Sequence, residues 1–78
     1  MNEDFVFLVE KEELWAKMLI EALENNKIPT VYFPVYGKAL SLQAWKEEIL
    51  RIYVPKEFYL QATKINEELF NLEVKVED

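Results

Sequence analysis

Residues 4–36 read DFVFLVEKEELWAKMLIEALENNKIPTVYFPVY, and this stretch predicts a strand, a helix and a second strand. Residues 5–9 are consecutive apolar residues, typical of a central strand buried on both faces. Apolar side chains then recur at helical spacing behind an acidic first turn, which favours a helix over residues 11–25. Residues 30–36 alternate as a strand does. Pro34 cannot donate a ladder hydrogen bond, so it predicts that this second strand lies at a sheet edge.

A stop signal separates the helix from the second strand. Asn25, Asn26 and Lys27 follow the last apolar residue of the helical pattern. Asn tolerates the left-handed conformation that a helix C-terminus needs, and Pro29 cannot continue a helix. We therefore expect the helix to end at about Asn25.

The second half of the chain repeats the order strand, helix, strand. Gly37, the only glycine, marks a turn, and residues 38–47 fit a loop, a hairpin extension or one helical turn. Residues 48–54 alternate as a third strand. A helix over residues 55–71 begins with a proline, whose missing N–H costs nothing at the first helical position. Residues 72–77 alternate as a short final strand.

The resulting order, β-α-β-β-α-β, is the signature of the ferredoxin-like split βαβ sandwich. We therefore expect one α+β domain over residues 1–78. One antiparallel sheet, in the spatial order 4-1-3-2, carries both helices on a single face. The second strand falls at an edge in that order, where Pro34 independently places it.

Composition limits the classes of function. The chain has 51% hydrophobic residues and neither Cys nor His, so we expect it to fold without a disulfide or a structural metal. A net charge of −6 and a single arginine argue against binding nucleic acid or an anionic membrane. The start is acidic and no apolar run is long enough for a secretory signal or a membrane span. We expect a cytoplasmic protein.

The sheet should leave one face open to water or to a partner. The side chains expected to face the helices are Phe5, Phe7, Val9, Val31, Phe33, Leu50, Ile52, Val54, Val74 and Val76. The side chains expected on the open face are Val6, Leu8, Tyr32, Ile49, Arg51 and Tyr53. A solvated sheet face is usually polar, whereas Tyr and Arg are enriched at interfaces. A one-residue slip in strand phase would exchange the two sets.

Three alternatives are open for this face. Two copies of the chain associate through it; or it takes another protein or a ligand; or Leu40, Leu42 and Trp45 fold back over it as additional core. Trp45 is then either a lid or an exposed anchor, and Trp15 is expected in the core or at its rim. The interaction candidates are Tyr32, Tyr36, Trp45, Ile49, Arg51 and Tyr53.

Catalytic chemistry is not expected. Without His or Cys the usual base and nucleophile are missing, and Ser41 has no activating partner. The adjacent acids Glu12-Glu13, Glu47-Glu48 and Glu67-Glu68 point apart on a helix or a strand. One glycine cannot build a phosphate loop, so we expect no cofactor and no metal. RNA-recognition motifs share the topology, but the third strand here lacks their basic, glycine-containing signature.

These observations predict a non-enzymatic regulatory or protein-interaction module. It would act through the open sheet face and the 37–47 loop, as a homodimer or with a protein partner. The alternative is a small-molecule sensor with a ligand between that loop and the sheet, where Lys38 and Arg51 would supply polar groups.

The order of elements also resembles a small bacterial family of signal-transducing proteins of unknown function. The resemblance covers residues 5–69 and includes ELWAKMLIEALENNKIP, RIYVPKEFYLQATKINEEL and the Ile28-Pro29 and Val54-Pro55 steps. It implies a ferredoxin-like fold akin to that of the PII nitrogen regulators, and a regulatory or sensing role. It brings no catalytic residues. The segment Gly37 to Glu47 is short beside the PII loop and has no phosphate-binding pattern, so nucleotide binding is not among our expectations.

Overall fold

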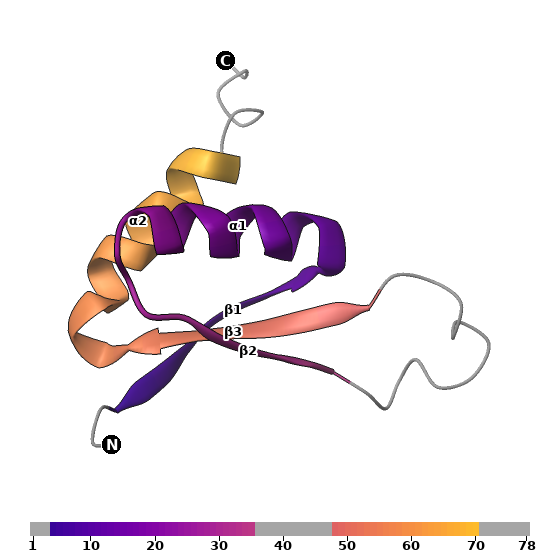
Figure 1. Cartoon of the computed structure of the whole chain (residues 1–78), viewed down its shortest axis with the longest axis horizontal. Helices are drawn as coiled ribbons and strands as arrows, with labels where there is room; N and C mark the ends of the chain where they lie inside the picture. The colour runs from indigo at the N-terminus through magenta and orange to yellow at the C-terminus, as the bar shows by residue number, and fades with distance from the viewer. Residues whose placement is uncertain (1–3, 36–47, 71–78) are drawn as a thin grey trace, which may run out of the picture.

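Three strands and two helices make up the described part of the chain. The structure is a computed structural model that describes residues 4–35 and 48–70. Its elements are β1 (Phe5–Glu12), α1 (Glu13–Asn25), β2 (Val31–Pro34), β3 (Ile49–Pro55), a 3₁₀ turn (Lys56–Phe58) and α2 (Tyr59–Phe70). Both helices lie on one side of the sheet (Figure 1). The segment 38–47 and the expected final strand over 72–77 lie outside the described residues.

The sheet has the order β1-β3-β2, and β3 is antiparallel to both of its neighbours. β1 and β2 therefore run in the same direction, and α1 is the crossover between them. The prediction of an α+β domain with an antiparallel sheet is confirmed. The described strands also keep the relative order that was expected for the first three strands.

Pro34 sits in β2 without removing a ladder hydrogen bond. The N–H of Val35 donates to the carbonyl of Ile49 at 2.8 Å. Hydrogen-bonded positions alternate along an antiparallel pair, so Phe33 and Val31 also turn their N–H groups toward β3. The N–H of Tyr32 and the ring nitrogen of Pro34 point away from β3. The missing N–H of proline thus falls at the free edge, as expected.

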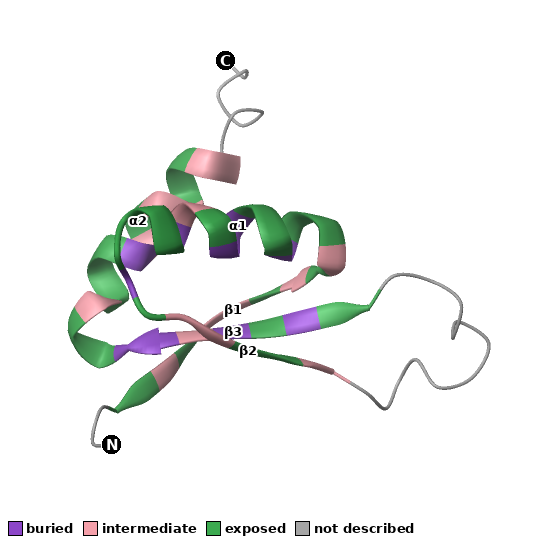
Figure 2. Ribbon diagram, viewed as in Figure 1, coloured by how far each residue is buried: buried purple, intermediate pink, exposed green. Residues whose placement is uncertain are grey.

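The core lies between β3 and the two helices. Its buried apolar residues are Ala16, Leu19, Ile20, Leu23, Ile28, Leu50, Ile52, Val54 and Ala62. Alternate residues of β3 face the helices, as predicted for that strand. Figure 2 shows buried positions along β3 and on the side of α1 that faces the sheet. Because Ala62 is the buried residue of α2, that helix can approach the sheet closely.

The expected start of α1 at Lys11 was two residues early, because β1 continues to Glu12. Glu10, Lys11 and Glu12 pair with residues 49–51 of β3 rather than forming the first turn of the helix. A register shift between Phe7 and Val9 lets the longer strand follow β3. The N–H of Glu13 then donates to the carbonyl of Glu48 at 2.7 Å, which fixes the first helical residue beside the start of β3.

The end of α1 at Asn25 was predicted correctly, but lysine rather than asparagine adopts the left-handed conformation. Lys27 has a φ of 60°. Its N–H donates to the carbonyl of Glu24 at 2.9 Å, and the N–H of Ile28 donates to that of Leu23 at 3.0 Å. These two bonds define a Schellman motif, and the buried side chains of Ile28 and Leu23 supply its apolar contact.

Pro55 ends β3 instead of beginning a helix, which corrects the sequence prediction. Its φ of −62° and ψ of 142° are extended. Pro55 pairs with Phe5, and the N–H of Lys56 donates to the carbonyl of Asp4 at 2.8 Å. The ladder between β1 and β3 therefore continues past the proline, and α2 begins only at Tyr59 after the 3₁₀ turn.

Candidate functional site

The strand register assigns side chains to the face of the sheet away from the helices. Directly opposite residues of an antiparallel pair lie on the same face. Since Leu50, Ile52 and Val54 face the helices, Ile49, Arg51 and Tyr53 face the other way. Their partners in the register lie on the same face, and so does Phe5, which precedes Phe7 by two residues in β1. We define the open face as Phe5, Phe7, Glu10, Glu12, Val31, Phe33, Ile49, Arg51 and Tyr53.

The predicted phase was right for β3 and wrong for most of the other two strands. Phe5, Phe7, Val31 and Phe33 were expected to face the helices and lie on the open face. Val6, Leu8 and Tyr32 were expected on the open face. Val6 pairs with Val54, Tyr32 pairs with Ile52, and Leu8 packs against the core. Val9 is the β1 residue that keeps its predicted face, opposite Ile52.

The physical reason is that neither strand alternates in polarity. Residues 5–9 are apolar at every position, and the aromatic residues of β2 are adjacent in sequence. Burial therefore gives no preference for one phase, and a slip of one residue moves every side chain to the other face.

Three aromatic rings form a cluster at the middle of the open face. The Tyr53 ring meets Phe7 at 5.8 Å between centroids and Phe33 at 5.7 Å, each with an interplanar angle of 71°. These are edge-to-face contacts, the arrangement that aromatic pairs favour. Phe7 is nevertheless 47% exposed and Phe33 54% exposed. The cluster fixes the rings in place yet leaves much of their surface in water.

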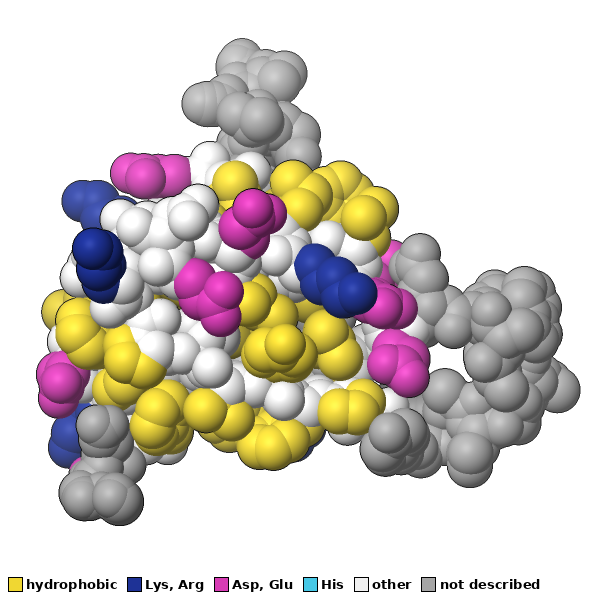
Figure 3. Space-filling model, viewed as in Figure 1, with side chains coloured by type: hydrophobic (Ala, Val, Ile, Leu, Met, Phe, Trp, Pro, Cys, Tyr) yellow, Lys and Arg dark blue, Asp and Glu magenta, His cyan; other side chains and the backbone are white. Residues whose placement is uncertain are grey.

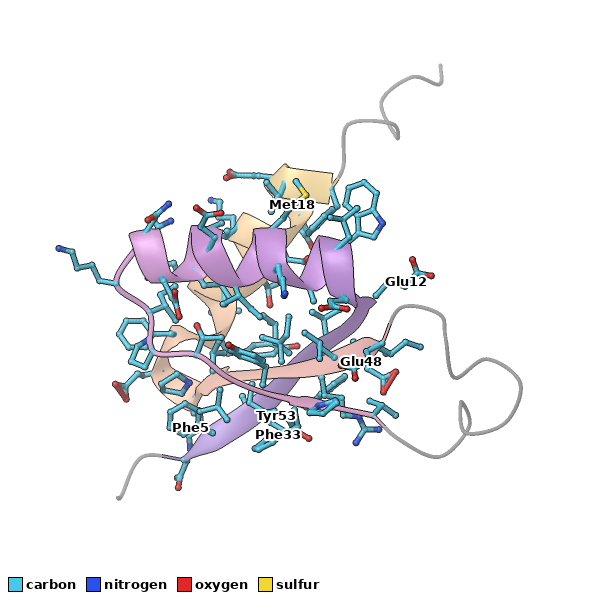
Figure 4. The ribbon with its side chains drawn as sticks, turned by 45° about the vertical axis from the view of Figure 1, so that its right-hand side comes forward. Phe5, Glu12, Met18, Phe33, Glu48 and Tyr53 are labelled. Carbon is cyan, nitrogen blue, oxygen red and sulfur yellow. The ribbon has the colours of Figure 1, made fainter. Side chains whose placement is uncertain are left out.

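Two views show this surface. In Figure 4, Phe5, Phe33 and Tyr53 lie on the side of the strands away from the helices. Figure 3 shows apolar side chains gathered along the lower edge of the molecule, below the helices. The sheet thus presents apolar surface on the side opposite its core.

An ion pair borders the aromatic cluster. Nε of Arg51 donates to Oε2 of Glu10 at 2.8 Å, and the guanidinium carbon lies 5.6 Å from the centroid of Phe7. The hydrogen bond to Glu10, followed by one to Tyr53, raises the pKa of Arg51 above its ordinary value. The side chains of Arg51 and Glu10 are 49% and 39% exposed. The pair therefore orients the guanidinium beside the aromatic rings while leaving it accessible from water.

Charge is distributed unevenly along the open face. Residues that lie directly opposite one another form rows across the strands. The row after Phe5 contains Phe7, Tyr53 and Val31; the next contains Glu10, Arg51 and Phe33; the last contains Glu12 and Ile49. Figure 4 places Phe5 at one end of the sheet and Glu12 and Glu48 at the other. One half of the face is apolar, and the other half carries charged groups.

The structure brings together some of the predicted site residues. Ile49, Arg51 and Tyr53 lie on the open face; Tyr32 is exposed but lies on the other side of β2. Tyr36 and Trp45 lie outside the described residues. Sequence reasoning missed three further aromatic residues, Phe5, Phe7 and Phe33. The alternative strand phase, shifted by one residue as noted in the sequence analysis, would have placed all three on the open face.

A second exposed apolar patch lies on α1. Trp15 contacts Phe70 edge-to-face at 5.9 Å, and Nζ of Lys11 lies 4.1 Å from the centroid of Phe70. Leu14 and Met18 are exposed beside them, and Figure 4 shows Met18 on the side of α1 away from the sheet. Trp15 therefore packs at the rim of the core, one of the two places expected for it.

Neither the side chains of the described residues nor a relative identifies a chemistry for this chain. Residues 4–35 and 48–70 contain no group of three or more acidic, His or Cys side chains placed to hold a metal ion. Neither α1 nor α2, the helices within those ranges, has the length and apolarity that crossing a bilayer requires. No family model, curated protein or solved structure matches the sequence. The open face offers aromatic surface and a guanidinium, which are groups suited to binding.

Proposed function

We propose that this protein is a non-enzymatic regulatory or protein-interaction module that self-associates through the open face of its sheet, with the 37–47 loop contributing. The observation that carries the proposal is the exposed aromatic cluster of Phe7, Phe33 and Tyr53. Contiguous apolar surface on a monomer usually marks an interaction site. Aromatic residues with arginine are the side chains most enriched at such sites.

The area of the face indicates a weak, reversible association. β1, β3 and β2 have 8, 7 and 4 residues. At about 3.3 Å per residue and about 4.8 Å between strands, they give roughly 300 Å² of flat surface. A stable interface buries about 800 Å² per partner, more than twice that area. We therefore expect a dissociation constant of about 1 µM or weaker. Such an affinity suits a module that responds to its own concentration or to a competing partner.

A fuller fold is part of the same proposal. We propose that residues 72–77 form a fourth strand beside β1 and complete a ferredoxin-like βαββαβ sandwich. The order β1-β3-β2 supports this, because the position beside β1 is where that topology puts its last strand. A cytoplasmic location and a role like that of the signal-transducing family belong to this proposal as well.

A small-molecule sensor is the second candidate. Arg51 favours it, because an accessible guanidinium beside Phe7 suits a planar ligand that carries a carboxylate. Such a ligand would sit between the 37–47 loop and the sheet. If this candidate is right, the chain stays monomeric at all concentrations. The oligomeric state therefore separates it from self-association.

Light scattering on a sizing column over a wide range of concentration tests the proposal. The variants are Tyr53→Glu and Phe33→Glu, which put a carboxylate into the cluster. The matched control is Leu60→Glu, which adds the same charge on α2 where the side chain is 79% exposed. We expect the wild type and Leu60→Glu to dimerise as concentration rises, and both cluster variants to remain folded monomers.

Two results would contradict the proposal. If the wild type is a monomer throughout and the cluster variants stay folded, self-association is wrong and the sensor becomes the better candidate. If the wild type is a monomer and both cluster variants unfold, the face is covered by the protein's own chain. Circular dichroism on the same samples decides whether each variant is folded.

A further inference from the structure

The charges on the open face restrict how a second copy can pack on it. This inference rests on the proposed self-association. A dimer of identical chains has a two-fold axis, and for two stacked sheets that axis lies between them. It runs either along the strands or across them. Aligned packing of two sheets permits both orientations.

An axis across the strands stacks β1 on β1 and β3 on β3, so it brings no group of opposite charge to Glu10 or Arg51. If it passes through Arg51 and Glu10, Arg51 faces Arg51 of the second copy and Glu10 faces Glu10 of the second copy, so like charges meet. If it passes between Arg51 and Tyr53, the carboxylate of Glu10 faces the ring of the partner's Phe7. In the same arrangement Arg51 faces the ring of the partner's Tyr53, so neither charged group meets one of opposite sign. If it passes through Tyr53, Glu10 faces the partner's Phe5 in the same way.

An axis along the strands, midway between β1 and β3, has the opposite effect. It places β1 of one copy over β3 of the other. Because Glu10 is opposite Arg51 in the register, each carboxylate then faces a guanidinium of the second copy. Phe7 likewise faces the partner's Tyr53. The four charged groups alternate in sign around the axis, and the aromatic rings stack next to them.

We infer that the occupant of the open face is a second copy of this chain, packed about a two-fold axis that runs along the strands between β1 and β3. Each Arg51 then lies against both Glu10 of its own copy and Glu10 of the second copy.

Single-cysteine cross-linking tests this orientation, and the absence of native cysteine makes every introduced thiol unique. Ile49 lies at one end of β3 and Phe5 lies opposite the other end. Stacked sheets are about 10 Å apart, which a short bismaleimide can span. With the axis along the strands, Ile49→Cys lies next to Ile49→Cys of the second copy. With the axis across them, Ile49→Cys of one copy lies next to Phe5→Cys of the second copy. The two Ile49→Cys thiols are then too far apart to be cross-linked to each other.

The expected result is that Ile49→Cys alone cross-links at least 10-fold more than Leu60→Cys, the control on α2, and that Phe5→Cys also cross-links to itself. Cross-linking only in a mixture of Ile49→Cys and Phe5→Cys would overturn the orientation while self-association stands. Dimers in light scattering without cross-linking at any of these positions would overturn it too. If neither assay detects association, the proposed function fails together with the inference.

Discussion

Replacing Lys27 by glycine is expected to stabilise the protein. Lys27 holds a φ of 60° at the end of α1, where both hydrogen bonds of the Schellman motif depend on this conformation. A side chain with a Cβ adopts the left-handed region at a cost of about 1–2 kcal/mol. Glycine removes that cost but loses about 0.5–1 kcal/mol more conformational entropy on folding. The net gain in the free energy of unfolding is therefore about 0.5–1 kcal/mol.

Urea denaturation followed by circular dichroism measures this gain, and the melting temperature should rise by roughly 2–8 °C. Lys27→Ala separates the backbone effect from loss of the charge, because alanine keeps the Cβ and should give no comparable gain. Lys17→Gly is the matched control within the same helix, where glycine should destabilise by about 1 kcal/mol. If Lys27→Gly is no more stable than Lys27→Ala, the description of this helix end is wrong.

Three further predictions concern the core, the sheet edge and the ion pair. Ile52→Val should lower the free energy of unfolding by about 0.5–1.5 kcal/mol, since Ile52 is fully buried on β3; an unchanged urea midpoint would contradict the core assignment. Pro34→Val should change stability by less than about 1 kcal/mol but increase aggregation on heating, measured by turbidity, because it restores an N–H at the free edge. A clear gain in stability would instead mean that this N–H points at β3. Arg51→Glu and Glu10→Arg should each abolish dimerisation, while an equimolar mixture should form a heterodimer in light scattering; a mixture that stays monomeric would rule out Arg51–Glu10 contacts between copies.

The elements were predictable where a local signal was strong. The alternation of Leu50, Ile52 and Val54 identified both β3 and its buried face, and Pro34 identified the edge strand. The end of α1 followed from the residues after Asn25. Each of these signals is read from a few neighbouring residues, without knowledge of what packs on them.

The residues of the open face that were not predicted from the sequence could be assigned only from the pairing of the strands. Phe5 and Phe7 are flanked by apolar residues, so only the pairing with β3 decides which way they point. The extension of β1 to Glu12 has the same cause, because Glu10 pairs with Arg51 across the sheet. The residues that reasoning from sequence missed are thus those whose orientation is set by the register of a partner strand.

Self-association through the open face can be followed residue by residue in a dilution series recorded by ¹H–¹⁵N NMR. Spectra recorded from about 20 µM to about 1 mM cover the weak affinity expected from the area of the face. Self-association through this face predicts amide shifts that move with concentration at Phe7, Phe33, Arg51 and Tyr53, and that stay fixed on the outer side of α2. Shifts that are independent of concentration at all four residues, or that move only on α1 and α2, would contradict it.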